Sequence, residues 1–127
     1  MSGTTSILGP SNQIEIYRGS TKTYELEVVD AESVAINLTG ARVICTVKCD
    51  VSKPAPLIQK DSAAGATQVE ITSPLEGKAH IKFIPSDTKT MDVGEYVFDV
   101  WVVLATSEQY PVITPSPFIV LAGVTIL

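Results

Sequence analysis

The stretch Asp92-Val-Gly-Glu-Tyr-Val-Phe-Asp-Val-Trp-Val-Val-Leu104 carries the most regular alternation in the chain. Every second residue from Tyr96 to Leu104 is large and apolar, which predicts a β-strand over 95–104 with one face in the core. The opposite face also carries apolar residues, namely Val97, Trp101 and Val103, interrupted by Glu95 and Asp99. A strand that is apolar on both faces is either central in the fold or covers an interface.

Weaker alternation of the same kind recurs on both sides of this strand. Val, Ile and Thr together make up 40 of the 127 residues, and β-branched residues favour strands. We expect strands over 14–18, 22–30, 41–49, 57–60, 68–72, 78–84, 95–104, 110–114 and 118–121, and one helical turn over 85–91. Turn residues recur about every 8 to 12 positions, and this spacing predicts an all-β, antiparallel β-sandwich of about seven to nine strands.

The chain is long enough for one domain, which we place at 14–121. Residues 1–13 form a polar N-terminal arm with one apolar pair, Ile7 and Leu8, and residues 122–127 form an apolar C-terminal tail. The arm is either a disordered tail or a segment that docks Ile7 and Leu8 on a neighbour. The N-terminus lacks the basic and apolar regions of a signal peptide, so we expect synthesis in a reducing cytoplasm. The longest apolar run, Val100 to Ala105, is too short to cross a membrane.

The balance of charge excludes two classes of partner. Nine basic and 14 acidic residues give a net charge of −5. Proteins that bind nucleic acids or anionic lipid surfaces carry a positively charged surface, so we expect neither as a partner of this acidic chain. Hydrophobic residues make up 45% of the chain and charged residues 18%, a charged fraction below that of typical soluble domains. The apolar excess indicates surface that is buried against other proteins.

The residues that usually perform catalysis or bind metals do not cluster in this sequence. His80 is the single histidine and lies on the lysine side of its predicted strand, as expected for a surface residue. Cys45 and Cys49 are predicted to face the core as free thiols, because their Cα atoms would lie roughly 13 Å apart in one strand. Phosphate-binding and nucleophile-elbow motifs are also missing. We therefore expect a protein that is not an enzyme and has no metal or cofactor.

The segment Asp92-Val-Gly-Glu-Tyr96, followed by Val97-Phe98, resembles the Asp-x-Gly-x-Tyr-x-Cys signature of immunoglobulin-like (Ig-like) domains. The resemblance implies that Tyr96 is a tyrosine-corner residue whose hydroxyl bonds to the backbone just upstream, and that Gly94 allows the tight entry to the strand. Phe98 stands where those domains have a cysteine. The plainer alternative is an ordinary strand start that happens to contain a tyrosine.

A second segment, Asn37-Leu-Thr-Gly-Ala-Arg-Val-Ile-Cys-Thr-Val-Lys48, resembles part of the N-terminal domain of phage baseplate upper proteins and related Ig-like virion domains. Four further motifs occur in the matching order, so the resemblance covers roughly residues 14–121. They are the strand after Gly19, the strand from Gly77 to Phe83, the Pro-Ser-Asp-Thr turn with the strand after Gly94, and the strand from Pro117 to Val120.

Baseplate upper proteins continue into a linker and a distal receptor-binding domain, whereas the present sequence ends after the first domain. The resemblance implies a virion protein. Because the distal domain is missing from this sequence, we expect a capsid decoration or cement subunit, present in several copies or as a homo-oligomer. A tail or baseplate component is the first alternative, and a carbohydrate- or cell-surface-binding Ig-like module is the second. The expected partners are the major capsid protein or the tail and baseplate proteins.

The predicted interface combines the outer face of the strand over 95–104 with the two ends of the chain. Tryptophan and tyrosine are frequent interface anchors. A second interpretation of Trp101 is a core residue covered by a loop. The candidate interface residues are Ile7, Leu8, Val97, Trp101, Val103, Tyr110, Val124, Ile126 and Leu127.

Overall fold

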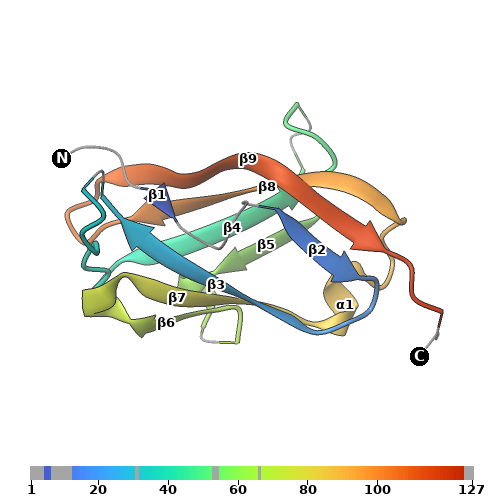
Figure 1. Cartoon of the computed structure of the whole chain (residues 1–127), viewed down its shortest axis with the longest axis horizontal. Helices are drawn as coiled ribbons and strands as arrows, with labels where there is room; N and C mark the ends of the chain where they lie inside the picture. The colour runs from blue at the N-terminus through green and yellow to red at the C-terminus, as the bar shows by residue number, and fades with distance from the viewer. Residues whose placement is uncertain (1–4, 7–12, 31, 53–54, 66, 125–127) are drawn as a thin grey trace.

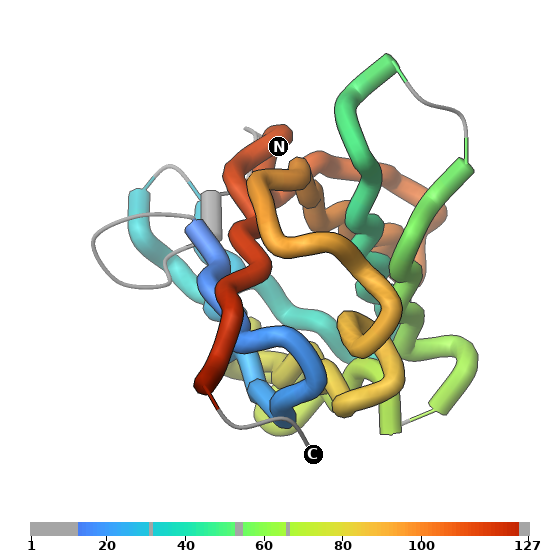
Figure 2. The backbone as a smooth tube through the Cα atoms, turned by 90° about the vertical axis from the view of Figure 1, so that its right-hand side faces the viewer, coloured from blue at the N-terminus to red at the C-terminus, as the bar shows by residue number. Residues whose placement is uncertain are grey.

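The computed structural model describes residues 5–6, 13–30, 32–52, 55–65 and 67–124, which form two packed β-sheets (Figures 1 and 2). The strands are β1 (Thr5–Ser6), β2 (Ile14–Tyr17), β3 (Lys22–Val29), β4 (Arg42–Lys48), β5 (Ile58–Asp61), β6 (Val69–Ser73), β7 (Lys78–Phe83), β8 (Gly94–Val103) and β9 (Gln109–Leu121). Short helical turns are η1 (Ser62–Ala64), η2 (Pro74–Glu76) and α1 (Pro85–Thr88). Among these elements, no helix is long and apolar enough to cross a membrane.

The order of the strands defines the architecture. One sheet has the order β1-β3-β7-β6 and the other has the order β2-β9-β8-β4-β5. All pairs are antiparallel except β2 with β9, which lie parallel beside the end of the chain (Figure 1). If β3 to β9 are read as strands B, C, C′, D, E, F and G, the sheets are A-B-E-D and G-F-C-C′, with strand A divided between β1 and β2. This is the immunoglobulin arrangement, and the predicted Ig-like β-sandwich is therefore confirmed.

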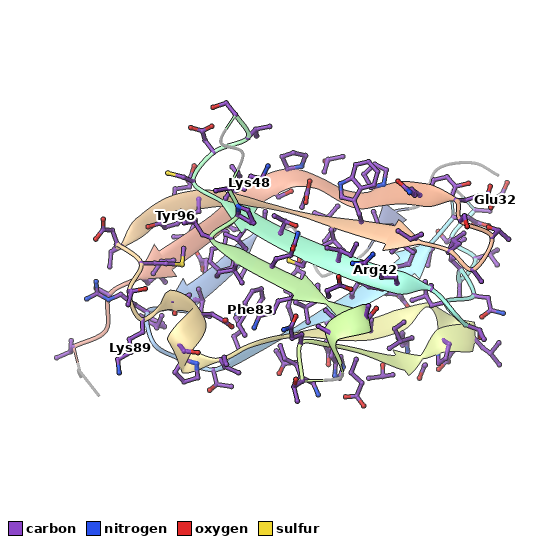
Figure 3. The ribbon with its side chains drawn as sticks, turned by 180° about the vertical axis from the view of Figure 1, so that it is seen from behind. Glu32, Arg42, Lys48, Phe83, Lys89 and Tyr96 are labelled. Atoms are coloured by element: carbon purple, nitrogen blue, oxygen red, sulfur yellow. The ribbon has the colours of Figure 1, made fainter. Side chains whose placement is uncertain are left out.

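Aromatic rings fill the centre of the core between the sheets. Phe98 of β8 contacts Tyr24 of β3 edge-on, with ring centroids 5.9 Å apart, and lies 6.3 Å from the ring of Phe118. Phe83, labelled in Figure 3, packs against Phe118 with the ring centroids 5.5 Å apart. Tyr24 and Phe98 belong to the B and F strands, which a disulfide joins in antibody domains. An aromatic contact between the sheets replaces that bond here.

The start of β8 has the geometry that the Asp92–Tyr96 motif implies. The hydroxyl of Tyr96 donates a 2.6 Å hydrogen bond to the backbone carbonyl oxygen of Asp92. This is the bond that a tyrosine corner makes. Gly94 has a φ of +156°, an angle that residues with a side chain rarely adopt. The motif thus fixes the angle at which the chain enters the strand.

A buried ion pair closes one side of the sandwich. Lys60 of β5 points inward, and its Nζ lies 2.7 Å from Oδ2 of Asp87 in α1 and 6.0 Å from the centre of the Phe83 ring. The same Asp87 oxygen accepts a 2.8 Å hydrogen bond from the Ile84 N–H at the start of α1. The pair connects the edge of the five-stranded sheet to the turn that crosses between the sheets.

Two expectations about strands and cysteines are wrong. Residues 110–114 and 118–121 belong to one strand, β9, because two irregularities in its register with β8 accommodate the intervening residues and place both Val112 and Ile113 in the core. Cys45 is buried as expected, but Cys49 is exposed because β4 ends at Lys48, before the alternation reaches it.

Candidate protein-interaction face

The outer face of the five-stranded sheet carries a continuous row of apolar side chains across β4, β8 and β9. Side chains directly opposite one another on neighbouring antiparallel strands point to the same side of the sheet. The register places Trp101 opposite Ile44 on one side and opposite Pro111 on the other. We call the following residues the apolar face: Ile44, Val97, Trp101, Val103, Pro111 and Pro117.

Trp101 lies near the middle of the apolar face and is its largest side chain. It keeps 39% of its surface exposed, while Val97 and Val103 are half-buried. Its indole N–H donates a 3.2 Å hydrogen bond to Oδ2 of Asp99, two residues earlier on β8. This bond satisfies the polar atom of the ring and leaves an apolar surface toward solvent.

A shallow pocket of about 60 Å³ lies beside Asp99 on the same face. Its walls come from β4, β8, β9 and the loop after β4, which extends away from both sheets (Figure 2). Lys48, labelled in Figure 3, lies at one end of β4 and contributes to the wall. The pocket has the volume of a small side chain, and its lining residues are Thr46, Lys48, Val51, Val97, Phe98, Asp99 and Pro115.

The charged groups of this sheet lie mainly at its margins. Arg42 pairs with Asp61 of β5, and its Nε lies 2.9 Å from Oδ1 of Asp61. The hydrogen bond from Arg42 lowers the pKa of the Asp61 carboxyl. Glu95 lies exposed at the other end of β8. Asp99 lies between Val97 and Trp101 on β8, and Lys48, at the end of β4, lines the same pocket.

The outer face of the four-stranded sheet has the opposite character. Its register places Glu25 opposite His80, and Glu25 Oε1 lies 3.6 Å from His80 Nε2. Lys82 forms a 2.9 Å ion pair with Glu70. The hydrogen bond from Lys82 lowers the pKa of the Glu70 carboxyl. A wide, polar concavity of about 800 Å³ runs along β3 and β7. Paired charges of this kind are typical of a surface that stays in contact with water.

Pro117 of β9 affects how another strand could pair with the edge of the five-stranded sheet next to the apolar face. Among the described residues, β2 pairs with residues 118–121 of β9 and with none of the earlier residues of that strand. The Leu121 carbonyl accepts a hydrogen bond from the Arg18 N–H, so it points away from β8. Backbone groups of alternate residues point the same way along a strand, so those of residues 119 and 117 also point away from β8. Pro117 therefore lacks a donor on the open side of β9. Because proline denies a hydrogen bond to an incoming strand, a partner is expected to bind the face and not the edge.

The structure brings together some of the predicted interface residues. Val97, Trp101 and Val103 share the apolar face, whereas Tyr110 pairs with buried Val102 and lies on the other side of the sheet. Tyr110 is only half-buried there, and its hydroxyl donates to Oε2 of Glu108. Tyr110 therefore does not share the outer surface of the sheet with Trp101, and its role in an interface stays a prediction.

The predicted contributions from the chain ends are only partly described. Val124 follows β9 and is fully exposed. Ile7, Leu8, Ile126 and Leu127 lie outside the described residues. Thr5 and Ser6, from the predicted arm, pair with β3 as strand β1.

Sequence reasoning missed three members of the apolar face, namely Ile44, Pro111 and Pro117. Ile44 lies between the inward residues Val43 and Cys45, so the alternation of β4 already places it outward. Pro111 lies inside the strand expected over 110–114, and Pro117 lies just before the strand expected over 118–121, but sequence alone gives neither a facing direction. Among the described residues, no group of three or more His, Cys, Asp or Glu side chains could hold a metal ion.

No protein-family model matches the chain, and no curated protein matches it. Solved structures do match. CopC from Methylosinus trichosporium OB3b aligns over 98% of this chain and 99% of its own, with 11% sequence identity and a TM-score of 0.54. The GspB Siglec domain structure aligns over 97% of this chain and 59% of its own, with 16% identity and a TM-score of 0.52.

A third solved structure, the Lin-41 filamin domain, aligns over 96% of this chain and 95% of its own, with 13% identity and a TM-score of 0.48. Identities this low show a shared fold and nothing about a shared activity. The strand order and the alignments define the chain as an Ig-like β-sandwich module, with one charge-paired outer face and one apolar outer face.

Proposed function

We propose that this chain is a non-enzymatic structural module that binds another protein through the apolar face, as a subunit of a tailed-phage virion. The observation that carries the proposal is the difference between the two outer faces. One face pairs its charges across strands, as a solvated surface does, and the other groups Trp101 with Val97 and Val103. A module of this kind completes the burial of its apolar surface in an assembly.

The size of the apolar face is compatible with this role. Three strands spaced about 4.8 Å apart and about 24 Å of β8, from Val97 to Val103, give roughly 350 Å². Patches of about 300–600 Å² on a monomer are often functional. A standard interface buries about 800 Å² per partner. The apolar face would therefore form the centre of an interface whose rim includes Arg42, Asp61 and Glu95.

The virion assignment rests on the resemblance of residues 37–48 and the ordered motifs around them to phage Ig-like virion domains. We place the module first on the capsid, as a decoration or cement subunit in many copies bound to the major capsid protein. Attachment to tail or baseplate proteins is the alternative, and the same face would serve there. In either case the protein is made in the host cytoplasm and ends in the virion.

The experiment compares two variants in a phage that carries this gene. Trp101→Ala removes the centre of the apolar face, and Leu75→Ala removes an apolar residue that is 75% exposed on η2. An interface anchor contributes about 2 kcal/mol or more, so Trp101→Ala should reduce incorporation into virions by roughly 30-fold. It should weaken incorporation far more than it lowers the Tm of the monomer, and Leu75→Ala should change neither. Cryo-EM of the virions then locates the protein.

Normal incorporation of Trp101→Ala, or a loss of stability that accounts for the whole defect, would contradict the proposal. A binding module for carbohydrates or cell surfaces is the second candidate. Two observations favour this second candidate, namely the name of the Siglec domain structure and the small pocket beside Asp99. A glycan array with reproducible hits that disappear in Trp101→Ala would support this candidate over the virion role.

A further inference from the structure

Asp99 is a carboxylate at the apolar face, and it shares its pocket with Thr46 and Lys48. It lies on β8 between Val97 and Trp101, is half-buried and pairs in register with Thr46 of β4. Within the described part of the chain it forms no ion pair. The 3.2 Å hydrogen bond from the indole of Trp101 is at the long end of the usual range and comes from a neutral donor. In the monomer, the exposed part of the Asp99 side chain is open to water.

Covering the apolar face would remove that water. A carboxylate that loses its hydration without gaining an opposite charge is strongly destabilised. Lys48 lines the same pocket but forms no ion pair with Asp99 among the described residues, so a partner that covers the apolar face should supply the cation. Asp99 thus constrains the chemistry of the partner, whereas the apolar residues around it only provide contact area.

A second copy of this chain does not meet the requirement. A two-fold packing that buries the apolar face of both copies would bury both Asp99 carboxylates, because Val97 and Trp101 flank Asp99 on β8, and the apolar face of neither copy supplies a cation. The net charge of −5 on each copy adds repulsion between the copies. The position of Asp99 therefore opposes pairing between copies through this face.

We propose that the apolar face binds a protein segment that presents an arginine flanked by apolar side chains, with the guanidinium on the Asp99 carboxylate and against the Trp101 ring. The proposal rests on the proposed function and names the chemistry of its partner. Arginine fits better than lysine because its planar group stacks on an indole and bonds a carboxylate at two points. It is also less strongly hydrated than an ammonium group, which favours burial.

Trp101 is the only tryptophan of the chain, so intrinsic fluorescence reports on this site directly. The probes are the blocked peptide acetyl-Leu-Arg-Leu-amide and its citrulline analogue, which is neutral and nearly the same shape. We expect a saturable fluorescence change with the arginine peptide, in the millimolar range, and at least tenfold weaker binding of the citrulline peptide. Asp99→Asn should remove the difference between the two peptides. Equal binding of both peptides, or an unchanged preference in Asp99→Asn, would overturn the proposal.

Sedimentation of the purified chain provides an independent test. We expect the wild type to remain monomeric and Asp99→Asn, which keeps the shape but loses the charge, to self-associate at least tenfold more tightly. A wild-type dimer that Trp101→Ala dissociates would overturn the proposal, and so would an Asp99→Asn variant that stays as monomeric as the wild type. In virions, loss of incorporation in Trp101→Ala but not in Asp99→Asn would overturn the arginine contact alone. Normal incorporation of both variants would overturn the proposed function.

Discussion

Replacing Asp87 by asparagine removes one charge from the buried ion pair with Lys60, and we expect it to be among the most destabilising polar substitutions in this chain. The Lys60 side chain is 6% exposed and that of Asp87 is 15% exposed, with 2.7 Å between Nζ and Oδ2. The substitution keeps the shape of the side chain and an oxygen for the Ile84 N–H. The remaining change is a buried ammonium group that has lost its counter-charge.

The expected loss follows from the burial of the pair. Removing one partner of a buried ion pair costs about 3–5 kcal/mol, because the other charge stays desolvated. A domain of this length has roughly 6–19 kcal/mol of total stability. Lys60→Met should cost less, about 1–2 kcal/mol, because the Asp87 carboxylate is the more exposed partner and keeps its hydrogen bond to the backbone. The double variant should lose clearly less than the sum of the two single losses.

Urea unfolding, followed by circular dichroism at pH 7, measures all four free energies in one double-mutant cycle. A coupling energy of about 2 kcal/mol is expected. A control is Lys82→Met, which breaks the more exposed pair with Glu70 and should cost no more than about 1 kcal/mol. If Asp87→Asn cost no more than this control, the reasoning about burial would be refuted.

Three further predictions concern hydrogen bonds and titrating groups. Tyr96→Phe removes the tyrosine-corner bond and should lower the free energy of unfolding by about 1 kcal/mol in urea titrations. Arg42 lowers the pKa of Asp61 in the folded state, so its stabilisation is present above the unfolded pKa of about 4 and is lost as the pH falls through the folded value. Arg42→Gln should therefore show a smaller loss of stability between pH 5 and pH 2, and an unchanged acid limb would contradict this sign. Burial raises the pKa of Cys45 to about 12, so a thiol reagent at pH 8 should modify exposed Cys49 alone until denaturant is added.

Regular alternation predicted the parts of the fold that follow it. β3, β4 and β8 have apolar residues at every second position, and each lies where the sequence places it because a strand with period 2 has one register that buries its apolar side. The same alternation predicted that Tyr96 and Phe98 lie on one face of β8. The Ig-like strand order needed the tyrosine motif as well, since alternation does not specify which strands are neighbours.

Local pattern failed where tertiary context decides orientation. The prolines of β9 look like strand breaks, yet Pro117 is tolerated because its missing N–H faces the open edge of the sheet. The pairing of Tyr110 with Val102, which places it on the inner side of the sheet, also depends on the register of β9 with β8. Lys60 shares its face with Ile58, so alternation alone points it inward, but only the fold shows that Asp87 of α1 meets it there.

The contact between Tyr24 and Phe98 has a consequence for how this sandwich forms. Both cysteines are free, so the two sheets are joined by packing and not by a covalent bond. Folding therefore includes no oxidation step and no reshuffling of mispaired thiols, processes that take seconds to hours. Its rate is set by the search for non-local strand pairs, on the millisecond-to-second scale typical of β-sandwiches. A chain unfolded in denaturant should regain its structure equally fast with or without reductant.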